Sequence, residues 1–424
     1  MNNCLHNSAF LQTMNKNKKN QKGIQLRKHY AYELHMERFK GKNPFEEEQE
    51  EMNVFMLSTL REIISVVEER LKRGVKTPII FYSKKHIIMA DNLTVSLTEY
   101  MVYYYHMVEN LDIYITQGIL TKNEFSICTL QERPFYHNGF FCGSIMESFM
   151  VTSFLLGWYP TDAGKIDDNE LKDAFFLKNI NGRRFKAIVG QGPWDASISI
   201  SECQLFLQNQ GVTLQGIDAV MDVIGELVPN AIEHGETNCL LDVSCEKAEY
   251  IENERLVGGI TVSVVVLDFS DKLLWTALKK KIFVDADKQG YINKIERINT
   301  VKEAWKNHEI KFSDIYGEHD FYNVMAFQKI SGREGDRIDG GLGISTLIKR
   351  VQEYTRNDFC YVLSGNGALR LDTEFTESDM DGYIGFNMKR NFINAIPDES
   401  AVMKTKFYMP GVAYNLCFNF MEDE

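Results

Sequence analysis

An acid, an amide and an imidazole recur at four-residue intervals within the segment MDVIGELVPNAIEHGETN. On a helix, Glu226, Asn230 and His234 would lie on one face, because residues at i, i+4 and i+8 stack one above another. The surrounding apolar residues recur every three or four positions from Ile217, which predicts an amphipathic helix that Gly235 ends. A polar row beside a core-facing stripe is either solvated or functional, and His234 is best explained as a packed or capping residue.

Two later segments carry groups that a ligand could use. The run ITVSVVVLDFS predicts a buried strand that delivers Asp268 at its end, and a carboxylate in that place indicates a site. The run DGGLGISTLIKRVQEY places Gly340, Gly341 and Gly343 before an amphipathic helix. Glycines there let a ligand approach the backbone, and the unpaired N–H groups of a helix N-terminus bind anions, although a plain turn would also need glycines.

In this order, the helix with Glu-x-x-x-Asn-Ala, the strand ending in aspartate and the glycine turn resemble the GHKL nucleotide-binding superfamily of gyrase, heat-shock chaperone, histidine kinase and MutL type. The resemblance implies that Asn230 binds Mg2+, that Glu226 is the general base and that Asp268 accepts a hydrogen bond from the adenine amino group of ATP. The turn that holds the triphosphate then comprises Gly340, Gly341, Leu342, Gly343, Ile344 and Ser345.

The residue types suit these roles. An amide oxygen is a hard ligand for Mg2+, which keeps several waters and takes further ligands from substrate phosphates. A carboxylate one turn away can orient or deprotonate the attacking water or hydroxyl, since phosphoryl transfer needs position and charge neutralisation more than covalent help. A lone strand-end acceptor selects adenine over guanine by matching a donor.

The resemblance also implies the fold class, which is α/β. Residues 186–424 are expected to form a two-layer α/β sandwich of GHKL (Bergerat) type, and the tail FYMPGVAYNLCFNF is similar to the family's closing strand pair, here around Gly411. Residues 274–329 form a charged insertion that is longer than the family's usual lid and that could be a lid, a partner surface or both.

Two departures from the family pattern lie close to the expected site. The aspartate motif normally continues with glycines, but Ser270 and Asp271 stand at those positions here, so the adenine pocket is expected to be altered. Pro229 removes one helical N–H and clashes with the carbonyl of Gly225, which predicts a kink beside the catalytic pair.

The remaining sequence predicts a second domain, because 424 residues exceed the size at which one hydrophobic core stops growing. We expect a flexible tail over residues 1–40 and a mixed α/β region over 41–185. In that region the pattern predicts helices over 52–72 and 93–108 and strands over 77–82 and 111–116. The strand, helix, strand order suggests parallel pairing and is similar to STAS-type domains, which partner anti-sigma kinases.

Composition narrows the location and the partners. A formal charge of -12 disfavours nucleic acid as a partner, and the eight cysteines form none of the paired spacings that hold zinc, which suits a reducing cytoplasm. The run FFCGSIMESFMVTSFLLGWYP is interpreted as a buried helix, not a membrane span, because it carries Glu147 and several hydroxyls. The polar start of the sequence is not a secretory signal.

Three function classes stay open: an ATP hydrolase, an ATP-dependent kinase, and a non-catalytic nucleotide-binding switch or interaction module. None of the nine histidines lies in a His-Glu dimerisation motif, which argues against a histidine kinase. The motif ELVPNAIEHG is similar to that of the anti-sigma serine kinases, which favours a protein serine/threonine kinase or a slow ATPase. The expected ligands are ATP and Mg2+, and the expected partner is another protein or a second copy of the chain.

Overall fold

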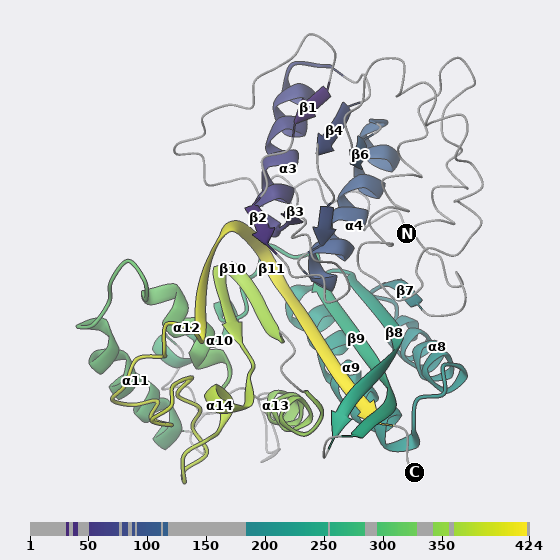
Figure 1. Cartoon of the computed structure of the whole chain (residues 1–424). Helices are drawn as coiled ribbons and strands as arrows, with labels where there is room; N and C mark the ends of the chain where they lie inside the picture. The colour runs from purple at the N-terminus through teal and green to yellow at the C-terminus, as the bar shows by residue number, and fades with distance from the viewer. Residues whose placement is uncertain are drawn as a thin grey trace, which may run out of the picture. The chain divides into compact units, whose positions relative to one another are not determined.

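The chain divides into two compact units in the computed structural model (Figure 1). One unit comprises Met1–Ala187 with Asp242–Glu246, and the other comprises Ile188–Leu241 with Lys247–Glu424. The residues that the structure describes are 31–33, 37–40, 51–75, 79–83, 87–89, 91–111, 113–117, 184–252, 255–284, 295–328, 342–355 and 360–421.

The first unit contains a parallel three-stranded sheet of order β1-β4-β6. Strand β4 (Ile79–Ser83) pairs in parallel with β6 (Ile113–Gln117), and helix α4 (Asn92–Glu109) lies between them in the sequence. The predicted strand, helix, strand order with parallel pairing is therefore confirmed. Strand β1 (Ala31–Glu33) pairs in parallel with β4, so part of the segment expected as a tail belongs to this sheet.

A second small sheet of the first unit has the order β2-β3-β5 and corrects one boundary. Its strands are Glu37–Lys40, Glu51–Phe55 and Ile87–Met89. The helix predicted from residue 52 begins only at Leu57, as α3 (Leu57–Lys72). The first residues pair instead as a strand, because polar and apolar side chains alternate over Glu51–Val54 with the period of a strand.

A five-stranded sheet of order β10-β11-β9-β8-β7 forms the main layer of the second unit. Its strands are β7 (Arg184–Val189), β8 (Cys239–Glu252), β9 (Arg255–Asp268), β10 (Tyr361–Arg370) and β11 (Val402–Met421). The predicted buried strand ending in Asp268 is confirmed, because Asp268 is the last residue of β9 and residues 262–268 are buried.

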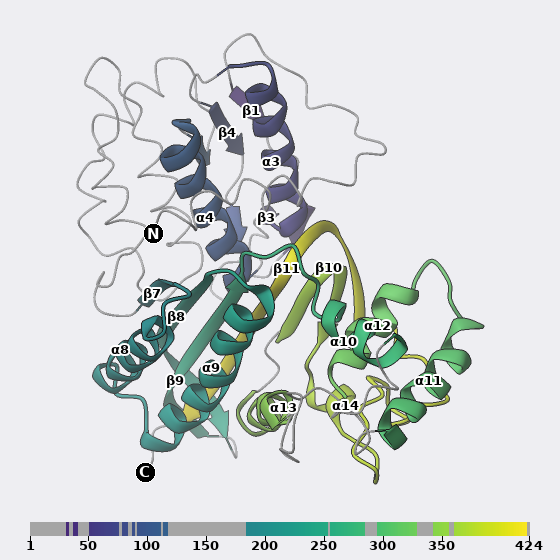
Figure 2. The same ribbon diagram turned by 180° about the vertical axis from the view of Figure 1, so that it is seen from behind.

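Helices form a second layer over this sheet. Helix α9 (Leu214–Gly235) lies behind the sheet in Figure 1 and in front of it in Figure 2, so it covers one face. Helix α8 (Asp195–Asn209) packs on α9, and α13 (Leu342–Tyr354) packs on both α9 and β11. The predicted α/β class is confirmed by this arrangement.

The closing strand pair predicted around Gly411 is wrong, because β11 is one strand that passes through Gly411 without a turn. Its first part pairs antiparallel with β10 up to Asn415, and its last part pairs antiparallel with β9 from Ala413 onward. The strand therefore exchanges neighbours close to Gly411. The apolar residues of its second half suit a central strand that is covered on both faces.

The described residues of the charged insertion expected over 274–329 form three helices, α10 (Thr276–Phe283), α11 (Ile295–Glu309) and α12 (Glu318–Ala326). Aromatic rings hold them together: Trp305 stacks on Tyr322 with centroids 5.0 Å apart and meets Phe283 and Phe321 edge to face. The insertion is thus a helical subdomain with its own aromatic core. The short helix α14 (Thr373–Thr376) follows β10.

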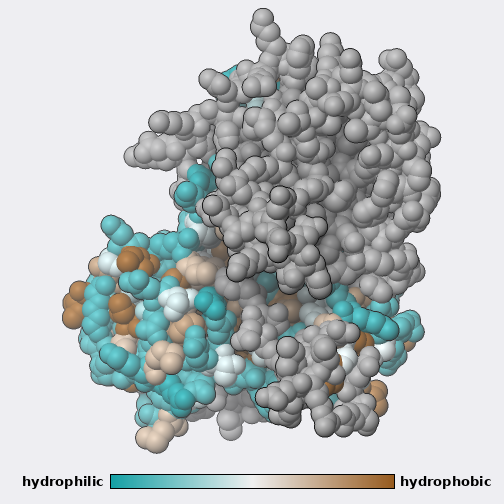
Figure 3. Space-filling model, viewed as in Figure 1, coloured by the Kyte–Doolittle hydropathy of each residue, from teal (hydrophilic) through white to brown (hydrophobic). Residues whose placement is uncertain are grey.

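The surface of the second unit is mainly hydrophilic on the face seen in Figure 3, with scattered hydrophobic residues over the insertion. Val284, Ile310 and Ile315 are the exposed large hydrophobic residues of the insertion among those the structure describes. Single exposed apolar side chains of this kind are ordinary for a protein surface. No helix among the described residues is both long and apolar enough to cross a membrane, and residues 140–160 lie outside the described ranges.

Candidate functional site

Helix α9 carries the polar row that the sequence places on one face. Its N-cap Thr213 accepts a hydrogen bond from Gly216 N at 3.1 Å, and the chain leaves the helix through Glu236 in the left-handed conformation with φ 53°. The helix ends at Gly235 as predicted and runs as one helix through Pro229. Its core-facing residues are Ile217, Val220, Val223, Ile224, Leu227 and Val228.

Glu226 and Asn230 are half-buried beside this stripe. Within the described parts of the chain, neither side chain has a hydrogen bond or an ion pair. Asp222, one turn before Glu226, is bound instead by Arg350 of α13, with Arg350 Nη2 2.6 Å from Asp222 Oδ2. This ion pair holds α13 against the polar row of α9. The next two residues of the row, Glu226 and Asn230, keep their polar groups available to a ligand.

The glycine turn is only partly described. The expected amphipathic helix is confirmed, but α13 already begins at Leu342, so Gly343, which was expected before the helix, lies in its first turn. The side chains of Ile344 and Ser345 are half-buried in that turn. Gly340 and Gly341 lie outside the described residues.

Asp268 is buried at the end of β9 and accepts three hydrogen bonds. Its Oδ1 accepts from Ser270 N at 3.0 Å and Ser270 Oγ at 2.7 Å, and its Oδ2 accepts from Val412 N at 3.1 Å. Burial raises the pKa of this carboxyl to about 6, and the three donors only partly offset that rise. A carboxylate has about four lone-pair positions, so one acceptor position is left for a further donor.

Two glycines let neighbouring elements approach this carboxylate. A Cβ atom on Gly411 would lie 1.9 Å from Asp268 Oδ1, which no side chain can tolerate. A Cβ atom on Gly235 would lie 3.5 Å from the Asp268 Cβ atom, so the end of α9 meets the end of β9. Lys272 Nζ lies 2.9 Å from Glu236 Oε2, and this ion pair joins the segment after β9 to the residue after α9. Asp268 and the end of the helix that bears Asn230 therefore belong to one corner of the fold.

Ser270, which the sequence marks as a departure from the family, supports Asp268. It closes an Asx-type turn on the aspartate, and its Oγ also accepts a hydrogen bond from Lys272 N at 3.1 Å. The Asp-x-Ser spacing is a signal from which sequence reasoning could have found this turn. The contributions of Val412 and Gly411 depend on pairing over a long sequence distance, so no local pattern predicts them.

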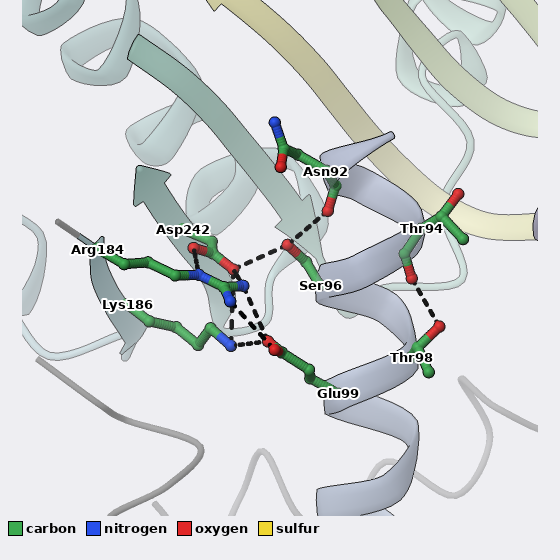
Figure 4. A network of polar contacts seen from close by, with 8 residues as sticks. All are labelled: Asn92, Thr94, Ser96, Thr98, Glu99, Arg184, Lys186 and Asp242. Atoms are coloured by element: carbon green, nitrogen blue, oxygen red, sulfur yellow. Dashed lines mark hydrogen bonds and ion pairs between the residues drawn. The ribbon is translucent and has the colours of Figure 1, made fainter. Parts of the chain in front are cut away.

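A buried charge network in the first unit is a second cluster that the sequence did not reveal (Figure 4). Arg184 of β7 bridges Glu99 of α4 at 2.8 Å and Asp242 of β8 at 2.5 Å. Lys186 forms an ion pair with Glu99, and Ser96 Oγ donates to Asp242 Oδ2 at 2.8 Å. Burial raises the pKa of the Asp242 carboxyl, but Arg184 and Lys186 outweigh burial and lower this pKa to about 2.

This network is charge-balanced, with two cations and two carboxylates, and its four charged residues are at most 7% exposed. Buried ions that satisfy one another leave no position for a substrate, so the network is a structural tie between α4 and strands β7 and β8. Among the described residues, no group of three or more His, Cys, Asp or Glu side chains could hold a metal ion.

Comparison with known proteins identifies no relative: no protein-family model, no curated protein and no solved structure matches the chain. The corner formed by α9, β9 and β11 is the candidate functional site.

Proposed function

We propose that residues 186–424 form a Mg-ATP-binding domain of GHKL (Bergerat) type. The observation that carries the proposal is the meeting of Asp268 with the end of α9, the helix that bears Glu226 and Asn230. Adenine recognition needs a buried acceptor, and phosphoryl transfer needs a nearby metal ligand and a base. These groups come from one helix and one strand end, and the helix α13 that follows the glycine turn packs on the same α9.

The adenine end of ATP fits Asp268. Three of its lone-pair positions accept from the protein, and the remaining position would accept from the adenine amino group. The rigid setting from Ser270, Val412 and Gly411 fixes the direction of that acceptor before the base binds. Preorganised acceptors of this kind lose little entropy on binding.

The phosphate end fits Asn230, Glu226 and the start of α13. Asn230 would hold Mg2+ through its amide oxygen, and the metal would supply charge neutralisation at the phosphates. The N-terminus of α13, with Gly340, Gly341 and Gly343 around it, would bind the triphosphate through backbone N–H groups. Glu226, which lacks an ion-pair partner among the described residues, is free to accept a proton from the attacking group.

The activity that this arrangement supports best is slow ATP hydrolysis or phosphoryl transfer to a serine or threonine of a protein. The unit formed by residues 1–187 and 242–246 would bind or sense another protein, or pair with a second copy, in the cytoplasm. The alternative is a nucleotide-binding switch without turnover, which is favoured by Ser270 and Asp271 at positions where GHKL proteins carry glycines.

One experiment separates these readings. The full chain is titrated with Mg-ATP by calorimetry and then incubated with labelled ATP, with and without a cell lysate. Released phosphate indicates the hydrolase, a labelled protein band indicates the kinase, and binding without either product indicates the switch. The absence of binding heat for Mg-ATP would overturn the assignment to a nucleotide-binding domain.

A further inference from the structure

A closed ring of hydrogen bonds joins Asp268 to the first residues of the helical insertion. On one side, Asp268 accepts from Ser270, and Ser270 Oγ accepts from Lys272 N at 3.1 Å. Two residues later, Leu274 N donates to Ser364 Oγ of β10 at 2.9 Å. The other side of the ring returns from Ser364 to Asp268 through β11.

Ser364 closes the ring from the strand side. Its hydroxyl donates to Gly411 O at 2.9 Å while it accepts from Leu274 N, so both capacities of the hydroxyl are used. The residue after Gly411 is Val412, whose N–H donates to Asp268 Oδ2 at 3.1 Å. Ser364 is 3% exposed, so water cannot replace either partner without opening the sheet.

The ring ends where the insertion begins. Trp275 directly follows Leu274, precedes α10 and packs on Tyr322 of α12 with ring centroids 4.9 Å apart. Lys279 of α10 lies over the same Tyr322 ring, 4.3 Å from its centroid, and forms an ion pair with Glu318 at 2.9 Å. A shift of Leu274 would therefore move the contact between α10 and α12.

We propose that Ser364 is a positioning residue that couples occupancy at Asp268 to the order of the helical insertion. This inference rests on the proposed nucleotide site. A base bound to the remaining acceptor of Asp268 holds Val412 and Ser270 in place, and Ser364 passes that restraint from β11 to Leu274. Without the Ser364 hydroxyl, Leu274 N and Gly411 O lose their shared partner, and the restraint stops at β11.

The test is amide hydrogen exchange of the full chain with and without Mg-ADP, followed at residues 272–283. In the wild type, Mg-ADP should slow exchange of this segment at least fivefold. Ser364→Ala should still bind Mg-ADP, with an affinity lowered by no more than about tenfold, the value of one hydrogen bond, but the slowing over 272–283 should vanish. Ser364→Thr, which keeps the hydroxyl, should restore it.

A matched control is Ser263→Ala in β9, another buried serine of the same sheet. Among the residues that the structure describes, its hydroxyl makes one long contact, 3.9 Å to Cys417 Sγ. This variant should transmit the slowing as the wild type does. Transmission in Ser364→Ala equal to that of Ser263→Ala overturns the inference, and so does wild-type binding of Mg-ADP without slowing at 272–283.

Calorimetry separates this failure from failure of the nucleotide site, because a wild type that gives no heat with Mg-ADP removes both proposals. If Ser364→Ala does not fold, the wild type and Ser364→Thr decide: slowing in both supports the ring, and slowing in neither overturns it.

Discussion

At the residue scale, Asp268 does two tasks that are usually separate. It ties β9 to β11 through Val412, and in the proposed site its remaining acceptor position would bind the adenine amino group. Burial raises the pKa of the Asp268 carboxyl, because a buried carboxylate that is not fully paired holds its proton more tightly. The residue is therefore expected to affect both folding and base binding, with different dependences on pH.

The stability effect has a definite sign. The pKa of about 6 in the folded protein lies above the usual value of about 3.9, so the folded state binds the proton more tightly than the unfolded state. The stabilisation from protonated Asp268 is then complete below about pH 4 and is lost as pH rises through about 6. We expect urea unfolding of the wild type to show this fall, amounting to at most about 3 kcal/mol, and Asp268→Asn to lack it. Parallel pH profiles for the two proteins would contradict the assignment.

The binding effect of the same substitution is measured at neutral pH. If the Asp268 carboxylate accepts from the adenine amino group, Asp268→Asn should weaken ATP binding by about 1.5–3 kcal/mol, the range for hydrogen bonds to charged groups. Calorimetry with ATP gives the value, and a folded Asp268→Asn protein is confirmed by circular dichroism. Unchanged affinity would move adenine recognition to another residue.

Glu226 and Asn230 separate catalysis from binding. Glu226→Gln should keep Mg-ATP affinity and lower turnover by roughly 10²–10⁴-fold, the usual contribution of a positioned proton acceptor. Asn230→Ala should weaken binding itself, because it would remove the proposed protein ligand of the Mg2+ that joins Asn230 to the phosphates. Affinity and phosphate release or transfer are measured on both variants. If Glu226→Gln turns over ATP at the rate of the wild type, or if the wild type shows no turnover with any partner tried, the protein is a binding switch and not an enzyme of the proposed kind.

At the element scale, local patterns predicted the parts of the candidate site that are local. The α9 stripe and the β9 apolar run follow the periods of a helix and a strand, so α9 ends where Gly235 predicts and β9 ends in Asp268. The path of β11 could not be predicted, because pairing with two different strands is decided by tertiary contacts. The prediction of where α3 starts was wrong for a similar reason, because EMNVF pairs with other strands in a sheet.

The corner formed by α9, β9 and β11 is the part of the candidate site that the sequence predicted least. The sequence named Asp268, marked Ser270 as a departure from the GHKL pattern and gave Ser364 no role. Both serines act through hydrogen bonds whose partners are fixed by the turn and by the sheet. Residue type alone does not distinguish a buried hydroxyl with two partners from a solvated one.

Two glycines give a matched test of how closely these elements must approach. Gly411→Ala places a methyl group against Asp268 Oδ1, so it should destabilise the protein by about 1–3 kcal/mol and weaken ATP binding. Gly225→Ala on α9 meets no atom within 4 Å and should stabilise by about 0.5–1 kcal/mol, because alanine suits a helix interior. Urea unfolding of both variants provides the comparison. Equal effects of the two substitutions would contradict the close approach at Gly411.

At the scale of the whole molecule, strands β7 and β8 contribute residues to both compact units. The charge network of the first unit includes Arg184 and Lys186 of β7 and Asp242 of β8. Replacing a whole buried charge network by apolar side chains can leave stability unchanged. Removing one charged partner destabilises the fold, because it leaves a buried charge without compensation.

Arg184→Leu should therefore destabilise the chain by about 3–5 kcal/mol, because the two buried carboxylates Glu99 and Asp242 would both lose their ion pair with Arg184. The control is Arg73→Ala, which removes an exposed pair with Glu69 on α3 and should cost less than about 0.5 kcal/mol. Thermal and urea unfolding report both values. A small effect of Arg184→Leu would show that the network is relaxed in solution and does not tie α4 to the strands.

The place of β11 in the sheet also affects how the chain is made. Strands β7, β8 and β9 leave the ribosome well before β11, which later inserts between β9 and β10. Until then, the apolar β9 presents an unpaired edge during synthesis of the whole helical insertion, and such edges promote association between chains. Newly made molecules should thus depend on chaperones during this interval, and slowing translation between β9 and β11 should increase the aggregated fraction.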